Sequence, residues 1–559
     1  MKKFQELEYV RPDFDAVRAG MKKFAADFRK AASYEEMRNL ILEQEKFISP
    51  FMTMCTIASV RNTMDMNDAF YEAEVNAINE FSGEISVLSK EVNAAILESP
   101  YKENIKKEFG PLMIQSMETS LKLASEAIIE DMAEEAKLCQ EYSKTAATCS
   151  TTFRGEECNF YGLLKHMQST DREERKEAFE AWAALYEKAS AELDPQYEGL
   201  TKLRKGMAEK LGFANYIDMI YPQRGRYDYT KDDVAKFRKQ VKDVIVPVCS
   251  RLYEEQRKRL GVDTLYYYDE SLVYKEGNAV PNGTKDELVE KAQVMYHELS
   301  KETGEFFDFM KEHELFDLET KKGKHQGGYC TFLNDYKAPF IFSNFNGTSA
   351  DVDVLTHEAG HAFEAYTASR VQPLSDMVFS TSEINEIHSM SMEHFTYPWM
   401  ESFFGENADK YRYAHLASAL QAIPYLVCVD EFQHRVFESG DLTAADRRAI
   451  WHELEETYMP WRNYDGNAFL EEGGFWMQKQ HIFLYPFYYI DYALAQMGAF
   501  EFYAKMCEDK EAAFADYYKL CKAGGSMGYF DTLRYAGLSN PFEEGTVKKI
   551  VDFVESKLF

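Results

Sequence analysis

The sequence predicts a mainly α-helical protein with a small β-sheet, and three observations lead to this fold class. Of the 559 residues, 45% are hydrophobic and 14% are aromatic, as in a folded globular protein. Glycine and proline are sparse, whereas Glu, Lys, Ala and Leu recur at the spacing of amphipathic helices. Runs typical of strands are few and gather in residues 328–345. The length is enough for a large core and for two or more lobes.

Amphipathic helices are predicted along the N-terminal part of the chain, at residues 13–32, 34–44 and 103–142. The same periodicity continues at residues 171–193 and 230–260. The chain contains no fixed-period repeat and no low-complexity linker. We therefore expect an N-terminal helical lobe, residues 1–150, packed as one body with a second region, residues 151–559.

The predicted strands lie in the middle of the chain. Residues 265–268, Leu-Tyr-Tyr-Tyr, form one short candidate strand. A stronger signal is the pair of aromatic-rich runs 328–333 and 339–345, which flank a short polar loop and so predict a hairpin. Asn346-Gly347 then predicts a turn at the end of the second run.

A long helix is predicted directly after this hairpin. Thr348 and Asp351 resemble a capping box, so the helix should begin there and run to about Ser369. An edge strand close to this helix can pair its backbone with an extended peptide. An ordinary structural hairpin explains the same pattern, and the residues alone leave both readings open.

Charge and cysteine usage exclude several classes of protein. The formal net charge of −30 should repel nucleic acid and anionic membrane surfaces. No run approaches 18 consecutive apolar residues, so no membrane span is expected, and the first residues do not resemble a secretory signal. Nine scattered cysteines without a Cys-x-x-Cys pair favour reduced thiols and a cytoplasmic location.

The most informative motif is His-Glu-x-x-His, from His357 to His361, inside the long predicted helix. Side chains at i and i+4 leave the same face, so the two imidazoles can hold one Zn²⁺ with Glu358 beside a water that the metal activates. The motif therefore predicts metal-assisted hydrolysis. Gly360 costs about 1 kcal/mol in a helix interior relative to alanine, which indicates a close neighbour that needs the space.

A third protein ligand is needed, because a catalytic zinc site keeps one position open. The extended motif, with Gly three and His six residues after His361, is not met, since Glu364 and Thr367 stand there. A further helix is predicted to begin at residues 380–383. It carries five groups able to bind a metal, and spacing alone does not choose among them: Glu383, Glu386, His388, Glu393 and His394.

This stretch resembles the M3 family of zinc metallopeptidases, the thimet oligopeptidase clan, and most closely the oligoendopeptidase F and Pz-peptidase branch. In that family the third ligand is a Glu in a Glu-x-x-Ser-x-x-x-Glu arrangement, which Glu386, Ser389 and Glu393 match here. The resemblance implies one Zn²⁺ per chain held by His357, His361 and Glu386, with Glu393 orienting a ligating imidazole. One departure is Glu364, where other members often carry His.

The resemblance covers roughly residues 150–545 and is fainter before residue 100. It implies a zincin-like fold in which the small sheet lies beside the His-Glu-x-x-His helix and a deep channel lies between two lobes. The second region, residues 151–559, is then the catalytic M3 peptidase region.

A second group of residues supports this interpretation. His481, Tyr485, Tyr489 and Tyr492 would fall within an arc of about 80° on one helix, kinked at Pro486. An aromatic core stripe is the alternative, but four polar-tipped groups on one face are costly to bury without partners. The family resemblance implies that such residues face the substrate.

The expected function is that of a zinc-dependent endopeptidase acting on short peptides. Glu358 is the predicted general base and Tyr489 the favoured oxyanion donor, assisted by His481. Predicted substrate contacts are Tyr485, Tyr492, Phe342 and Asn344. Neither a nucleic acid nor a membrane is an expected partner, and the sequence does not determine the oligomeric state.

Two other functions compete with this one. A carboxypeptidase would need a cation for the terminal carboxylate, for which Arg370 and Arg534 are candidates. A helical scaffold or peptide-binding protein would carry the His-Glu-x-x-His motif by accident.

Overall fold

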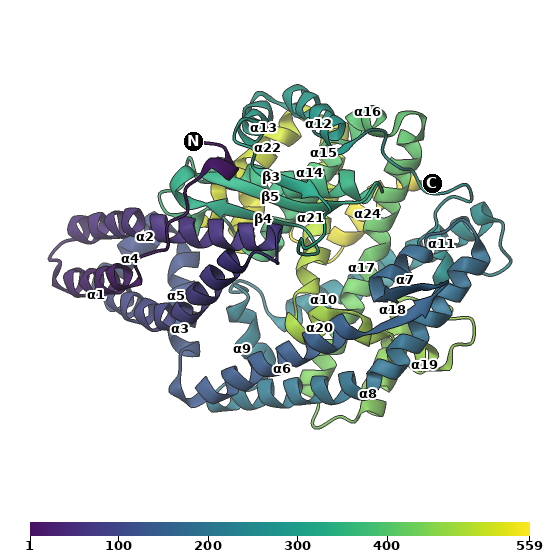
Figure 1. The fold of residues 1–559 in the computed structure, drawn as a ribbon, viewed down its shortest axis with the longest axis horizontal. Helices are drawn as coiled ribbons and strands as arrows, with labels where there is room; N and C mark the ends of the chain where they lie inside the picture. The colour runs from purple at the N-terminus through teal and green to yellow at the C-terminus, as the bar shows by residue number, and fades with distance from the viewer.

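The computed structural model describes residues 1–559 and confirms the predicted fold class (Figure 1). Helices make up most of the chain, and five strands form two small sheets. The helices that come before the central part of the larger sheet in the chain are α1 Phe14–Lys30, α2 Tyr34–Met64, α3 Ala69–Leu97, α4 Lys102–Phe109, α5 Pro111–Leu123, α6 Ile129–Thr148, α7 Phe160–His166, α8 Arg172–Lys210, α9 Tyr216–Gln223, α10 Lys231–Gln240, α11 Val246–Leu260, α12 Lys285–Leu299 and α13 Lys301–Glu312. The remaining helices are α14 Ala350–Ala368, α15 Ser382–Phe395, α16 Met400–Phe404, α17 Ala408–Glu438, α18 Ala444–Tyr458, α19 Ala468–Glu471, α20 Gln480–Leu484, α21 Tyr489–Glu508, α22 Lys510–Ala523, α23 Tyr529–Tyr535 and α24 Thr546–Leu558.

The predicted N-terminal helices are present, with one correction. Helix α1 starts where predicted because the Asp13 carboxylate accepts a hydrogen bond from the Ala16 amide, 2.9 Å away. The long helix predicted over residues 103–142 is instead divided into α4, α5 and α6. Gly110 ends α4 with φ 89°, and Pro111 opens α5. Proline is favoured in a first helical turn and so begins a new helix.

The larger sheet has three strands, β3 Phe316–Glu319, β4 Tyr329–Leu333 and β5 Ala338–Phe345, in the order β3-β5-β4. The predicted hairpin is confirmed, because β4 pairs antiparallel with β5. Strand β3 adds in parallel on the other side, which makes β5 the central strand and β4 the edge. The strand predicted over residues 265–268 is wrong; residues Tyr267–Asp269 form a 3-10 turn. The smaller sheet is a hairpin of β1 Ser150–Phe153 and β2 Glu156–Asn159.

Helices α14 and α15 approach each other very closely at Gly360, as its position in the motif predicted. A Cβ atom at Gly360 would lie 2.6 Å from the Ser389 Cα atom and 2.7 Å from the His388 carbonyl oxygen. Both atoms belong to the backbone of α15, so the contact cannot be relieved by a side-chain rotation. Glycine therefore sets the distance between the two helices of the motif region.

Gly360→Ala is expected to destabilise the protein by about 1–3 kcal/mol, because α15 must shift to admit the extra methyl group. Gly206→Ala in α8 is the matched control, since nothing lies within 4 Å of the added Cβ atom. That variant should gain roughly 0.5–1 kcal/mol from helix propensity. Thermal unfolding of both variants measures the difference; equal melting temperatures would refute the close-packing explanation.

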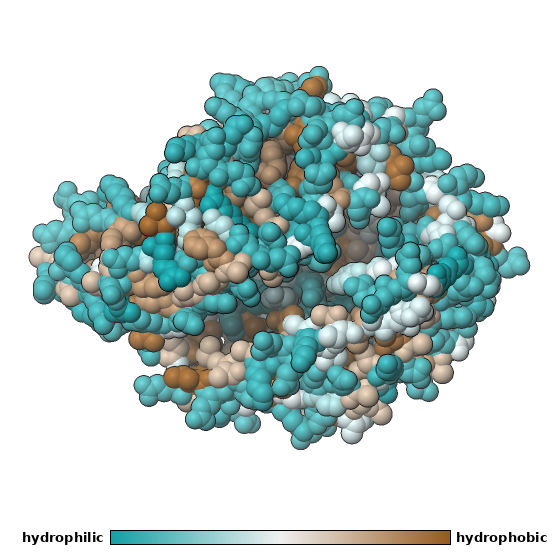
Figure 2. Space-filling view, in the orientation of Figure 1, coloured by the Kyte–Doolittle hydropathy of each residue, from teal (hydrophilic) through white to brown (hydrophobic).

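The buried apolar residues of α1, α3, α4 and α5 form two smaller clusters. The largest apolar core joins α2 and α6 to the rest of the chain. It includes Ile57 of α2, Tyr142 of α6 and Phe340 of β5. This shared core supports the predicted packing of residues 1–150 and 151–559 as one body, although the division at residue 150 remains a prediction. Figure 2 shows that the molecule is deeply hollowed between the part that carries the sheet and the helices α6 and α8.

All nine cysteines are free thiols, as their spacing predicted. No helix is both long enough and apolar enough to cross a lipid bilayer.

Candidate metal centre

Helices α14 and α15 bring His357, His361 and Glu386 together. One ligand atom from each residue lies within 4.8 Å of the other two. Glu386 Oε2 is 3.4 Å from His357 Nε2 and 3.6 Å from His361 Nε2. Ligands placed tetrahedrally about 2.0–2.1 Å from one zinc ion would be separated by about 3.3 Å. The three side chains thus fit a metal ion of this kind, and they are the set that the resemblance implied.

The N-terminal end of α14 differs from the predicted capping box. The Asp351 carboxylate accepts hydrogen bonds from the Asn346 amide, at 2.8 Å, and the Gly347 amide, at 2.7 Å. Asp351 therefore ties the helix to the turn after β5 rather than capping the helix through Thr348. The predicted turn at Asn346-Gly347 is confirmed, with Gly347 at φ 84°. This connection fixes the metal helix against the sheet.

Glu393 orients one of the two imidazoles. Its Oε1 atom is 2.5 Å from His357 Nδ1, which directs His357 Nε2 toward Glu386. Its Oε2 atom is 2.7 Å from His415 Nε2, and His415 Nδ1 is 2.6 Å from the Tyr397 hydroxyl. Such outer hydrogen bonds fix the orientation and tautomer of a metal-binding histidine. His415 comes from a different helix, α17, and no local pattern in the sequence pointed to it.

The charges of the group favour a bound cation. Burial alone would raise the pKa of Glu386, but the His357 and His361 side chains hold that pKa well below its usual range. Glu386 is therefore an anionic ligand at neutral pH. For His357, burial opposes the charged form, yet Glu386 and Glu393 raise its pKa well above the usual value. Protons therefore compete with a metal at this position up to a higher pH than at an ordinary histidine.

Glu358 lies beside the group with one oxygen unused. The residue is 8% exposed, and its Oε2 atom is buried without a hydrogen-bond partner. Burial raises the pKa of its carboxyl group. A Cβ atom added at Gly328, just before the edge strand β4, would lie 3.6 Å from Glu358 Oε1. The motif carboxylate thus lies next to the start of the edge strand.

The other candidate ligands of α15 do not join the group. His388 is fully buried, and its Nδ1 atom is 2.9 Å from the Ile384 carbonyl oxygen. His394 Nε2 lies 3.3 Å from the Gln496 amide. Glu383 is fully buried, with neither carboxylate oxygen hydrogen-bonded. Glu364 of α14 is also fully buried, 3.3 Å from His388 Nδ1.

The predicted stripe from His481 to Tyr492 on a single helix is wrong. Helix α20 ends at Leu484, α21 begins at Tyr489, and Phe487 between them has φ 62°. The rings nevertheless gather, because the centroid of His481 lies 4.7 Å from that of Tyr489 and 5.7 Å from that of Tyr485. Tyr492 is 6.1 Å from Tyr489. Tyr485 is 51% exposed, whereas Tyr489 is 8% exposed.

This break in the helix brings in Tyr488, which the sequence reasoning did not select. The Tyr488 hydroxyl donates a hydrogen bond to Glu386 Oε1, 3.3 Å away. Its ring stacks on His481 with centroids 5.8 Å apart. On one regular helix Tyr488 would share the face of His481 but lie about 10.5 Å further along the axis, so the break brings the two rings closer together. Tyr488 is the tyrosine with a hydrogen bond to the metal-binding group.

Two arginines hold the break in place. Arg224 Nε donates to the Pro486 carbonyl, at 2.9 Å, and Arg226 donates to the Phe487 carbonyl. Arg226 is also paired with the buried Asp491 carboxylate at 2.6 Å. Asp491 is therefore a structural residue.

The two predicted substrate contacts on β5, Phe342 and Asn344, do not lie where the sequence predicted them. Phe342 is fully buried in the central strand and stacks on Tyr329 at 4.8 Å, so its prediction as a substrate contact is wrong. The reason is the parallel strand β3, which the sequence did not reveal and which moves β5 away from the edge. The Asn344 side chain donates to the carbonyl oxygens of His325 and Gly327, which positions the segment before β4.

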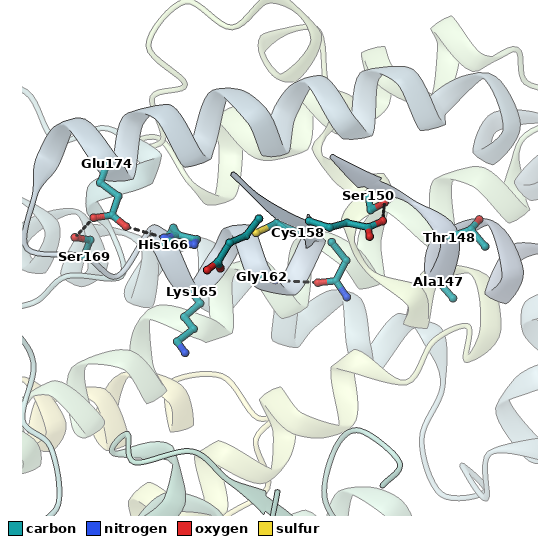
Figure 3. A pocket seen from close by; sticks show the side chains of 12 residues that line it. Ala147, Thr148, Ser150, Cys158, Gly162, Lys165, His166, Ser169 and Glu174 are labelled. Carbon is teal, nitrogen blue, oxygen red and sulfur yellow. Dashed lines mark hydrogen bonds and ion pairs between the residues drawn. The ribbon is translucent and has the colours of Figure 1, made fainter. Parts of the chain in front are cut away.

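A cavity of about 860 Å³ lies elsewhere, between the β1–β2 hairpin and α7 (Figure 3). Its polar groups bind one another: His166 Nδ1 is 2.6 Å from Glu174 Oε1, and the Ser169 hydroxyl donates to Glu174 Oε2 at 2.8 Å. None of the predicted site residues lines this cavity. It is therefore not the candidate site.

Comparison with known proteins decides the family. Residues 165–552 match the model of Peptidase family M3, and residues 4–124 match the Peptidase M3 N-terminal domain. The chain belongs to peptidase family M3. The first match spans well over half of the chain and agrees with the extent of the resemblance found in the sequence.

Relatives of this M3 peptidase support the oligoendopeptidase F branch. Oligopeptidase PepF of Bacillus subtilis is 21% identical over 570 residues, which cover 96% of this chain and 81% of that protein. The oligoendopeptidase F homolog of Borreliella burgdorferi is 24% identical over 325 residues, 56% of this chain and 53% of its own length. The solved structure of Pz peptidase A with an inhibitor is 44% identical, with a TM-score of 0.92 over 100% of this chain and 99% of that chain. These findings confirm the predicted class, a metalloendopeptidase.

Proposed function

We propose that this M3 peptidase is a zinc-dependent endopeptidase that hydrolyses internal bonds of short peptides, with Glu358 as general base. One observation carries the proposal: His357, His361 and Glu386 converge within 4.8 Å beside a buried Glu358 oxygen that has no partner. A donor set of two imidazoles and one carboxylate is typical of catalytic zinc.

His357, His361 and Glu386 would hold one zinc ion, which when bound supplies a Lewis acid for a water molecule and a peptide carbonyl. Glu358 takes the proton from the attacking water through its unpaired oxygen. The raised pKa of the buried Glu358 carboxyl makes it a better proton acceptor than an exposed glutamate and lets it pass the proton to the leaving amine. Glu393 and His415 keep His357 in the required orientation.

The substrate is proposed to lie in the hollow seen in Figure 2, along the edge strand β4. The position of Gly328 next to Glu358 supports this, because a peptide paired with the start of β4 would pass the general base. The free thiols support the proposed cytoplasmic location.

Tyr488 and Tyr489 are expected to differ as donors to the developing oxyanion. The sequence favoured Tyr489, but Tyr488 has the hydrogen bond to Glu386 Oε1. Loss of one oxyanion donor typically lowers turnover by about 10²–10³. We expect Tyr489→Phe to lower kcat by this amount with little change in KM. Steady-state kinetics of Tyr489→Phe and Tyr488→Phe side by side decide the role; an unchanged kcat for Tyr489→Phe removes it as the donor.

The competing carboxypeptidase function lacks support at the two arginines considered for it. Arg370 donates to the backbone carbonyl oxygens of Lys337 and Tyr366, and exposed Arg534 pairs with Asp531. An internally quenched peptide blocked at both ends separates the functions. Cleavage that a chelator stops and zinc restores supports the endopeptidase; cleavage of unblocked peptides alone supports a carboxypeptidase, and no cleavage supports a scaffold.

A further inference from the structure

A second cavity, of about 440 Å³, lies next to the metal centre. Its wall includes Asp353, one helical turn before His357 in α14, and His415, which binds Glu393. Further wall residues come from α17, from the segment Gly474–Gln478 with Lys479, and from residues 253–279. Lys479 lies two residues before His481 in the chain.

Of the five acidic, basic or histidine side chains that line this cavity, four already have partners. Arg462 Nε is 2.9 Å from Glu270 Oε1. The Tyr411 hydroxyl donates to Asp353 Oδ1 at 2.5 Å. His415 Nε2 is 2.7 Å from Glu393 Oε2. The fixed charges of the wall are thus largely compensated within the protein.

Lys479 is the exception. Its ammonium group makes no hydrogen bond and no ion pair, and its nearest recorded contact is the Tyr425 ring centroid, 6.0 Å away. The side chain is half-buried, and burial lowers the pKa of its ammonium group. An exposed lysine without a partner is well solvated, but a half-buried one loses water without gaining a counter-charge. In a chain with a net charge of −30, a half-buried lysine without an ion pair is unusual.

We infer that Lys479 binds a carboxylate of the peptide substrate in this cavity, beside the metal centre. The inference rests on the proposed function, because it needs a peptide in the channel. A carboxylate would supply the missing counter-charge, and Gln421 and Ser418 of α17 line the same cavity with neutral polar groups. The carboxylate is either the free C-terminus of a short peptide or an Asp or Glu side chain.

The test measures peptide binding to a Glu358→Gln host, so that it does not depend on cleavage. The probes are an N-acetylated octapeptide with a free C-terminal carboxylate, its C-terminal amide, and two further amides that differ only by Glu or Gln at one internal position, scanned along the peptide. A charge-assisted contact should make Lys479→Met weaken binding of a carboxylate probe about 10- to 100-fold. The affinity for the neutral counterpart of that probe should change by less than about twofold. Lys479→Arg should retain most of the affinity for the carboxylate probe.

In one probe pair, Lys479→Met should remove the difference in affinity between the charged and the neutral peptide. That pair identifies the source of the carboxylate. Lys165→Met is the matched control, because Lys165 lines the cavity of Figure 3, is exposed and has no carboxylate partner. It should change no affinity. Equal affinities of charged and neutral probes for the host, or an equal loss for both in Lys479→Met, would overturn the inference. Failure of the wild-type chain to cleave any peptide would instead reject the proposed function, while the binding result still decides Lys479.

Discussion

Replacing Glu358 with glutamine is expected to abolish peptide hydrolysis while the protein still binds one metal ion. Glu358 is the motif residue whose Oε2 atom is buried without a partner, and it is not among the three residues that fit the metal. Glutamine has the same shape but cannot accept the proton from water. Positioned proton transfer contributes roughly 10²–10⁴ in rate, so kcat should fall by at least that factor.

Two measurements keep this result interpretable. Elemental analysis should give the same metal content for Glu358→Gln and the wild type, and thermal unfolding should show a similar melting temperature. If both results are obtained, the loss of activity is caused by the loss of proton transfer. Cleavage at a rate close to the wild type would remove Glu358 as the general base.

Replacing Glu386 with alanine is expected to cause the largest loss of metal affinity among the acidic residues of α15. Glu386 Oε2 lies within 3.6 Å of both imidazole Nε2 atoms, and its pKa, opposed by burial but lowered by those imidazoles, keeps it anionic. Its removal takes away one of three protein ligands and the only negative charge among them. Activity and metal content should therefore be lost together.

Glu393→Ala is the matched control on the same helix. Glu393 contacts His357 through Nδ1, so its loss should weaken metal binding by about 10- to 100-fold, as is typical for residues that orient a ligand. The Glu386 variant should lose more. Metal titration monitored with a chromogenic chelator compares the two; equal retention of metal in both variants would reject Glu386 as the third ligand.

Much of the fold could be predicted because a helix is encoded by a local pattern of residues. The positions of α1, α14 and α15 follow from apolar periodicity and turn residues, and Gly360 predicted a close neighbour, which is the backbone of α15. The central place of β5 could not be predicted, because its parallel neighbour β3 carries no recognisable signal of its own. For this reason Phe342 was assigned to an edge that β4 occupies.

The residues of the candidate site also differ in how far the sequence alone could predict them. His357, Glu358 and His361 follow from one helical turn, whereas Glu386 needed the family resemblance, since five residues of α15 had suitable chemistry. Tyr488 shares the helical face of His481 at i+7 and was not selected, but its approach to Glu386 depends on a helix break that Arg224 and Arg226 hold through backbone carbonyl oxygens more than 250 residues away. Tertiary contacts of this kind leave no periodic trace in a sequence.

The most direct test of the account is the zinc content of the purified protein. After removal of metal by a chelator and dialysis against added zinc, we predict close to one zinc ion per chain and recovery of peptide cleavage in proportion to that content. A chain that takes up no zinc, cobalt or manganese in stoichiometric amount, or that cleaves blocked peptides equally well after chelation, would contradict it.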